Sequence, residues 1–385
     1  MMGSDFVTAG RIIFGSGKIA EFPSLAASFG KRALLVRGKT RAYGMSFYSL
    51  LDSAEFEVIE FGVSHEPEIV TINQAVSLAR ENDCEFVIGF GGGSVIDTAK
   101  AVSALLNNEG ELLDYLEVVG KGQPLKNPAK KFIAIPTTAG TGSEVTKNAV
   151  ISVPEQRVKV SMRSNFMLPT VALIDPLLTI GLPPDLTSTS GMDAFIQVVE
   201  PYVCNSPNLM VDMFCRDAIP RAAKYLLKAY EVGSDHEARV NMSWVSLLGG
   251  MSLANAKLGA VHGFAGPIGG MFDAPHGAVC AALMPAVMQV NSELLEVQGG
   301  KEAILNRFLE IGRWVTGREN ASIQDAADWF HEIGVKLKIQ SLKSFGIQRS
   351  DFPSIIEKSK NSSSMKGNPV QLTDTELARI LDLAY

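Results

Sequence analysis

The stretch EFVIGFGGGSVIDTAKAVSALL, residues 85–106, decides the fold class. It opens with a short apolar run that is typical of a buried strand, continues through three glycines, and ends in a segment that predicts a helix. A strand that passes through a glycine turn directly into a helix is a building unit of parallel sheets. This stretch therefore predicts an α/β domain.

The same alternation extends along the first half of the chain. Further apolar runs predict strands over residues 31–38, 56–62, 132–136 and 170–175. A helix is predicted over residues 70–83, after the second of these strands. Strands that alternate with helices predict a parallel sheet with helices on both faces.

Beyond Leu182 the strand pattern ends and helical periodicity takes over, at residues 238–257, 302–315 and 323–337. The two prolines of IGLPPD stop the preceding element. We therefore predict an α/β domain over residues 1–180 and an all-helical domain over residues 181–385.

Composition is compatible with a protein of the cytoplasm. A chain of 385 residues is long enough for two domains with large cores. The net charge of −6 argues against a nucleic-acid partner. No apolar run reaches membrane-spanning length, so we expect no membrane partner. The four cysteines are scattered without a CxxC pair and are interpreted as reduced thiols, at Cys84, Cys204, Cys215 and Cys280.

The glycine turn of the opening stretch is a candidate phosphate-binding loop. Gly91, Gly92 and Gly93 let the backbone approach a ligand without a Cβ clash. Ser94 and Asp97 match an S-x-x-D capping box at the start of the helix, whose free N–H groups suit a pyrophosphate. The alternative is an ordinary tight turn from strand to helix.

A second candidate loop, PTTAGTGSEVT at residues 136–146, also follows a predicted strand. Thr137, Thr138, Thr141 and Ser143 supply hydroxyls beside two glycines. An ordinary polar loop is the alternative, but two such loops after two strands of one sheet favour a shared ligand.

Four residues of the second half suggest a divalent metal site. Asp193 and Gln197 are four apart in a predicted helix and project from one face. His262 and His276 lie in a glycine-rich region, the latter in a stretch that resembles a turn. A carboxylate, an amide and two imidazoles suit a catalytic Zn²⁺ or Fe²⁺, although the amide oxygen is the weakest donor. Glu200 is interpreted as an exposed or helix-packing acid.

Five motifs, in order, resemble those of the iron-containing (group III) alcohol dehydrogenase family. They are GGGSVIDTAK, PTTAGTGSEVT, LPTVALIDPLLTIGLPPDLTSTSGMDA, GMDAFIQVVEPYV and LGAVHGFAGPIGGMFDAPHG. The family's metal ligands are an Asp and three His, and Gln197 stands at the second position. A further family His, four residues after His262, is Gly266 here. The retained set also resembles the three-ligand Zn site of the related glycerol dehydrogenases.

The resemblance implies an N-terminal nucleotide domain, a helical C-terminal domain and a nicotinamide dinucleotide held by both loops, with Lys159 facing it. Family members that prefer NAD carry an Asp in the turn after the first long strand. This chain has Gly38 there, flanked by Arg37, Lys39 and Arg41. An acidic residue would repel a 2′-phosphate, so we expect NADPH to be favoured over NADH. The alternative is a solvated basic turn.

These features predict a metal-dependent NAD(P)-linked alcohol dehydrogenase or aldehyde reductase, with Asp193, His262 and His276 at the catalytic centre. The expected substrate is a small alcohol or aldehyde, and the resemblance implies a homodimer. Two alternatives remain: an enzyme like maleylacetate reductase, and a nucleotide-binding member of the family with impaired catalysis, which Gln197 and Gly266 motivate.

Overall fold

The structure is a computed structural model, which describes residues 5–39, 45–53, 55–272 and 274–385. The chain forms two compact units. The α/β unit comprises Val7–Thr138 and Gly142–Gly181, and the helical unit comprises Leu182–Tyr385, Ala139–Thr141 and, before Val7, Asp5 and Phe6.

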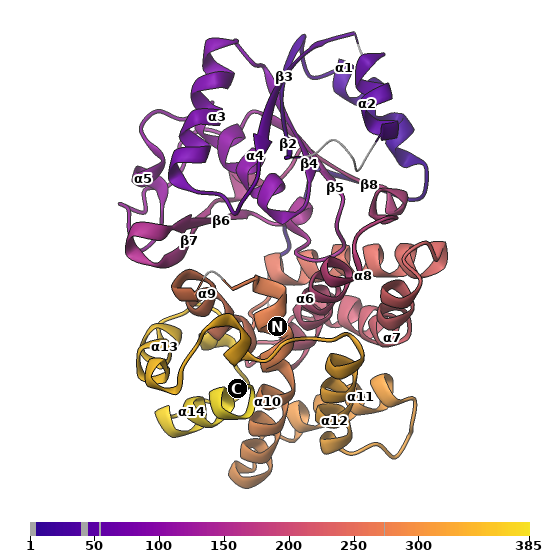
Figure 1. Cartoon of the computed structure of the whole chain (residues 1–385), viewed down its shortest axis with the longest axis vertical. Coiled ribbons are helices and arrows are strands. Elements are labelled where there is room, and N and C mark those ends of the chain that lie inside the picture. The colour runs from indigo at the N-terminus through magenta and orange to yellow at the C-terminus, as the bar shows by residue number, and fades with distance from the viewer. Residues whose placement is uncertain (1–4, 40–44, 54, 273) are drawn as a thin grey trace. The chain divides into compact units, whose positions relative to one another are not determined.

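The α/β unit is built on a six-stranded sheet whose neighbouring strands are all parallel, in the order β1-β8-β5-β4-β2-β3 (Figure 1). The strands are β1 (Arg11–Phe14), β2 (Arg32–Gly38), β3 (Glu57–Val63), β4 (Phe86–Gly91), β5 (Lys131–Pro136) and β8 (Val171–Ile174). Every residue of β4 is buried, which explains its uninterrupted apolar run.

Helices cover both faces of this sheet, as the sequence predicts. They are α1 (Phe22–Ala27), α2 (Met45–Asp52), α3 (Ile69–Glu81), α4 (Gly93–Leu105) and the short α5 (Leu112–Tyr115). Successive strand residues point to opposite faces. Leu34 of β2 thus packs in the hydrophobic cluster that contains residues of α3 and α4, whereas Leu35 packs in the cluster that contains Phe22 of α1 and Phe47 of α2.

The sequence analysis missed three strands of this unit. Besides β1, they are β6 (Asn148–Val153) and β7 (Val158–Arg163), which pair antiparallel in a separate hairpin. A 3-10 turn over Pro154–Gln156 joins these two strands. The hairpin has its own signal in the sequence, since apolar and polar residues alternate in β7 and half of the residues of β6 are β-branched Val or Ile.

The helical unit contains nine α-helices among the described residues (Figure 1). They are α6 (Pro184–Val203), α7 (Leu209–Glu231), α8 (His236–Asn255), α9 (Ala260–Phe272), α10 (His276–Gln298), α11 (Glu302–Thr316), α12 (Ile323–Lys336), α13 (Phe352–Lys360) and α14 (Asp374–Leu383). The predicted helical segments correspond to α8, α11 and α12, and α6 packs against α7, α8 and α10. Parallel sheet and helical unit together confirm the predicted fold class.

One helix has the length and composition of a membrane span. α10 has 23 residues, but 72% of its most apolar window is buried inside the protein. A core helix that is apolar on all sides has this composition without crossing a membrane.

Candidate metal centre

Helix α6 carries three acidic or amide side chains into the interior of the helical unit. Asp193, Gln197 and Glu200 are only 2%, 2% and 4% exposed. Their spacing of four and then three residues places them on one face of the helix. Buried polar groups of this kind need partners, and the partners come from α9 and α10.

His262 and His276 both lie at the beginning of a helix. His262 is in the first turn of α9, and His276 is the first residue of α10. The interpretation of His276 as part of a turn is therefore corrected to a helix start. Gly277 makes this position possible, because a Cβ there would lie 2.3 Å from the carbonyl oxygen of Thr189 in α6. Only glycine allows α10 to begin so close to α6.

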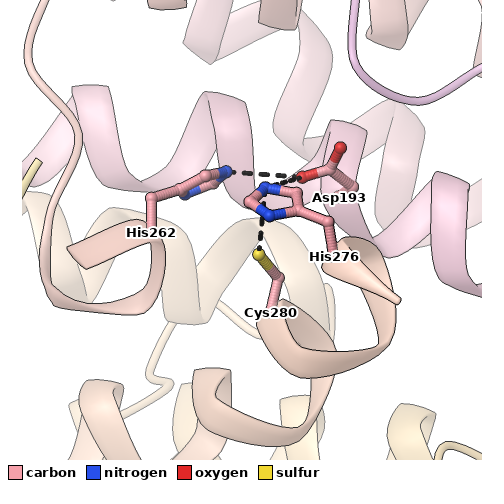
Figure 2. A group of neighbouring side chains, drawn as sticks. All are labelled: Asp193, His262, His276 and Cys280. Atoms are coloured by element: carbon pink, nitrogen blue, oxygen red, sulfur yellow. Dashed lines mark hydrogen bonds and ion pairs between the residues drawn. The ribbon is translucent and has the colours of Figure 1, made fainter. Parts of the chain in front are cut away.

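The side chains converge on the carboxylate of Asp193 (Figure 2). Its Oδ1 lies 3.3 Å from Nε2 of His262 and 3.7 Å from Nε2 of His276. His262 is buried, whereas the His276 side chain is 36% exposed. The three residues that the sequence singled out as catalytic are therefore brought together, with one imidazole reachable from outside.

Glu200 corrects the sequence-based interpretation. It is buried, and its Oε2 lies 2.6 Å from Nδ1 of His262 while Oε1 accepts a hydrogen bond of 2.7 Å from the Val261 N–H. A carboxylate on the far nitrogen of a histidine fixes the ring and strengthens the near nitrogen as a ligand. Its position two helical turns after Asp193 was the available signal.

The electrostatics of this cluster favour a cation. Burial alone would lower the pKa of His262, but hydrogen bonds and charges of Asp193 and Glu200 outweigh burial and raise the pKa to about 9. Burial also opposes ionisation of Asp193, yet the hydrogen bond from His262 and the nearby charge of His276 hold its pKa below the ordinary value. A centre that stabilises positive charge in this way also suits a divalent ion.

The structure adds Cys280 to the cluster. Cys280 is fully buried on α10, and its Sγ lies 3.7 Å from Nε2 of His276 (Figure 2). One donor atom from each of Asp193, His262, His276 and Cys280 lies within 4.8 Å of the others. The signal in the sequence was the spacing of four residues from His276 to Cys280 on one helix.

Gln197, the predicted weak ligand, lies beside this cluster. Its Nε2 is 3.5 Å from the carbonyl oxygen of Gly140, and its hydrogen bonding helps to lower the pKa of Asp193. Its buried Oε1 has no hydrogen-bond partner among the described residues. This oxygen, the Asp193 carboxylate, the two imidazoles and the Cys280 thiol together form a donor set that fits a divalent metal ion.

The predicted cofactor segments follow three neighbouring strands. Gly38, Gly91 and Pro136 are the last residues of β2, β4 and β5, which are adjacent in the sheet. The Thr137 N–H donates to the Gly91 carbonyl at 2.9 Å, so the two loops start side by side. In parallel sheets this edge is where ligands bind.

The predicted capping box at the first loop is wrong. α4 begins at Gly93 with Gly92 as its N-cap, and no side chain caps it. The Asp97 carboxylate accepts hydrogen bonds instead from the Ser143 hydroxyl and, at 2.9 Å, from the Val150 N–H. Asp97 therefore connects α4 with the second loop.

Lys100 is the residue that the sequence analysis missed here. It is fully buried, and its Nζ donates to Ser143 Oγ at 2.9 Å, Thr146 Oγ1 at 2.9 Å and the Asn148 carbonyl at 2.7 Å. Asp97 lies 3.5 Å away. This network holds the second loop to α4. Beside Lys100, burial raises the pKa of Glu144 to about 7.

Two of the predicted cofactor cations are already paired within the α/β unit. Arg37 Nε lies 2.7 Å from Glu60 Oε2, and Lys159 Nζ lies 2.6 Å from Glu66 Oε2. Lys39 is exposed next to Gly38. Arg41 lies outside the described residues.

Comparisons with known proteins agree over the whole chain. The iron-containing alcohol dehydrogenase model matches residues 9–176, and the model of the C-terminal part of the Fe-containing alcohol dehydrogenase family matches residues 187–385. The chain is similar to 1,3-propanediol dehydrogenase of Klebsiella pneumoniae, with 33% identity over 367 residues and 92% of each chain covered.

It is also similar to the NADPH-dependent butanol dehydrogenase of Clostridium saccharobutylicum, with 31% identity over 97% of this chain and 96% of the relative. Among solved structures, a 1,3-propanediol oxidoreductase superimposes with a TM-score of 0.91 at 31% identity, covering 100% of both chains.

Proposed function

The chain belongs to the iron-containing alcohol dehydrogenase family, and on this premise we propose how it acts as a metal-dependent, NAD(P)-linked alcohol dehydrogenase. The observation that carries the proposal is the convergence of Asp193, His262 and His276 from three helices on one buried point. When bound, a divalent metal there supplies Lewis-acid polarisation of a substrate oxygen.

The side chains have distinct roles in this proposal. Asp193, His262 and His276 hold the metal, with Gln197 as a weaker neighbouring donor. Glu200 orients His262 through the hydrogen bond to Nδ1. The exposed part of His276 marks the side from which a small alcohol or aldehyde reaches the centre.

The dinucleotide is assigned to the edge where β2, β4 and β5 end. The free N–H groups at the start of α4 bind the pyrophosphate, because they carry the positive end of the helix dipole. The loop residues proposed to contact the cofactor are Gly91, Gly92, Gly93, Ser94, Thr137, Thr138, Thr141 and Ser143. Asp97 is proposed to position Ser143, from whose hydroxyl it accepts a hydrogen bond, and Lys159, which is paired with Glu66, is proposed to face the cofactor.

We propose NADPH as the preferred cofactor. Gly38 leaves room and adds no negative charge at the end of β2, and exposed Lys39 can pair with a 2′-phosphate. Because Arg37 forms an ion pair with Glu60, the preference for NADPH is assigned to Lys39 among the described residues of this turn. The similar butanol dehydrogenase is NADPH-dependent by its name.

Gly38→Asp tests the cofactor preference. A Cβ at Gly38 meets no atom of the described residues within 4 Å, so we expect the fold to accommodate an Asp side chain there. We expect the ratio of kcat/KM for NADPH to that for NADH to fall by about tenfold or more, which corresponds to about 1.4 kcal/mol. Gly38→Asn is the control of equal size. A wild type that already prefers NADH tenfold would contradict the proposal.

The other assignments follow from the family and the composition. The metal is proposed to be Fe²⁺ or Zn²⁺, the substrate a small alcohol or aldehyde, the assembly a homo-oligomer and the location cytoplasmic. The relatives are named alcohol, propanediol and butanol dehydrogenases, which favours this activity over one like that of maleylacetate reductase and over an inactive nucleotide-binding protein.

His262→Ala tests the proposal directly. We expect metal content, measured by elemental analysis, and NADPH oxidation with a panel of short aldehydes to be lost together. The loss of activity should be at least a thousandfold, or about 4 kcal/mol. His331→Ala, which removes an exposed histidine of α12 in the same unit, is the control and should keep both. Full-rate turnover by protein shown to be free of metal would overturn the Lewis-acid role.

A further inference from the structure

We propose that the thiolate of Cys280 is the fourth protein ligand of the metal, in place of the histidine that Gln197 replaces. This inference rests on the proposed metal dependence and deepens it. The family set of one Asp and three His leaves three strong donors in this chain, and Cys280 restores the number to four.

The distances between the donors carry the argument. A tetrahedral ion with bonds of about 2.0 to 2.3 Å to N, O and S holds its ligand atoms about 3.3 to 3.7 Å apart. In the structure the donor atoms are 3.3 Å apart for Asp193 and His262, 3.7 Å for Asp193 and His276, and 3.7 Å for His276 and Cys280. All four donor atoms lie within 4.8 Å of one another, so one ion could contact all of them (Figure 2).

The position of Cys280 on its helix supports the same role. It follows His276 by one turn of α10, so both side chains project from one face of a rigid element. The close contact of Gly277 with Thr189 fixes the start of this helix against α6, which carries Asp193. Cys280 is fully buried, so the sulfur faces the cluster rather than solvent.

Gln197 is the competing candidate for the fourth position. Its amide nitrogen lies 3.5 Å from the carbonyl oxygen of Gly140 and its oxygen is unpartnered, but this neutral oxygen is a weaker donor than a thiolate. A thiolate together with the Asp193 carboxylate balances the charge of a divalent ion, and the thiol proton leaves to solvent. Because sulfur is a soft ligand, the completed site favours Zn²⁺ or Co²⁺ over Mn²⁺.

Cobalt substitution tests the assignment by spectroscopy. The full-length protein is stripped with a chelator and titrated with Co²⁺, and absorbance is followed in the near ultraviolet and the visible. We expect a sulfur-to-cobalt charge-transfer band in the wild type. Cys280→Ser should abolish this band and weaken Co²⁺ binding in a chelator competition by about tenfold or more, since a protein donor is lost.

Two variants serve as controls. Cys215→Ser removes another fully buried thiol of the helical unit, whose sulfur lies near Ser252, and should keep the band. Gln197→Ala should also keep the band, since the sulfur and not the amide completes the shell. Circular dichroism of every variant identifies any loss that is due to misfolding.

The outcomes separate this inference from the proposed function. Co²⁺ that binds to the wild type without a charge-transfer band, or a band that survives in Cys280→Ser, overturns the role of Cys280 while leaving the metal site in place. Failure of Co²⁺, Zn²⁺ and Fe²⁺ to bind to the wild type overturns the proposed function itself.

Discussion

The metal centre and the dinucleotide loops are built on opposite principles. The centre consists of side chains from α6, α9 and α10, which approach one another only because three helices pack closely. The loops consist mainly of backbone at the ends of β2, β4 and β5, whose positions the sheet itself fixes. The metal centre therefore depends on the identity of its side chains, whereas the dinucleotide loops depend on the path of the backbone.

This difference extends to the charged groups that support each region. Glu200 supports the centre by orienting one ligand. Lys100 supports the loops by joining three polar groups of the second loop and its following strand to α4. Loss of Glu200 should therefore affect mainly the metal, whereas loss of Lys100 should affect mainly the stability of the α/β unit.

The largest effect is expected for Lys100→Met. The change leaves Asp97 and the hydroxyls of Ser143 and Thr146 without their cation, and breaking a buried pair costs about 3 to 5 kcal/mol. We expect this loss in the free energy of unfolding by denaturant titration, with Co²⁺ affinity of the folded protein unchanged. Lys121→Met removes an exposed pair with Asp114 and should cost less than about 1 kcal/mol. A Lys100→Met protein that loses Co²⁺ binding but keeps the free energy of unfolding of the wild type would contradict this comparison.

A smaller effect is expected from the ionisation of Glu144. Because the pKa is raised from 4.5 to about 7 in the folded protein, the folded state binds the proton more tightly than the unfolded state. The contribution of protonated Glu144 to the free energy of unfolding is fully present below pH 4.5 and is lost as the pH rises through about 7. The loss is about 3 kcal/mol at most. When the free energy of unfolding is plotted against pH, wild type and Glu144→Gln should differ in slope between pH 4.5 and about 7 and have the same slope above it. Identical slopes over the whole pH range would contradict the raised pKa of Glu144.

The smallest effect on the fold is expected for Glu200→Gln. The amide keeps the shape and the acceptor for the Val261 N–H but removes the charge beside His262. Metal affinity should fall by about 10- to 100-fold, measured by chelator competition, with little change in unfolding midpoint. Glu293→Gln, which breaks a surface pair on α10, is the control. An unchanged metal affinity would show that Glu200 has only a packing role.

The sequence by itself determined the features that depend on short separations along the chain. The alternation of apolar runs with helical segments gave the α/β unit and the helical unit, because strand and helix periods are local. The same reasoning placed Asp193 and Gln197 on one helix face. The five motifs in order indicated the family, which the comparisons confirm.

Only the tertiary structure decided which distant side chains meet. Glu200 meets His262, Cys280 joins the metal ligands, and Lys100 joins Ser143 because elements far apart in sequence pack together. Arg37 and Lys159, which the sequence suggests as cations near the cofactor, are paired with Glu60 and Glu66, and these pairs too depend on how the segments pack. Periodicity fixes the direction of a side chain relative to its own helix or strand, whereas its partner depends on how that element is packed against the others.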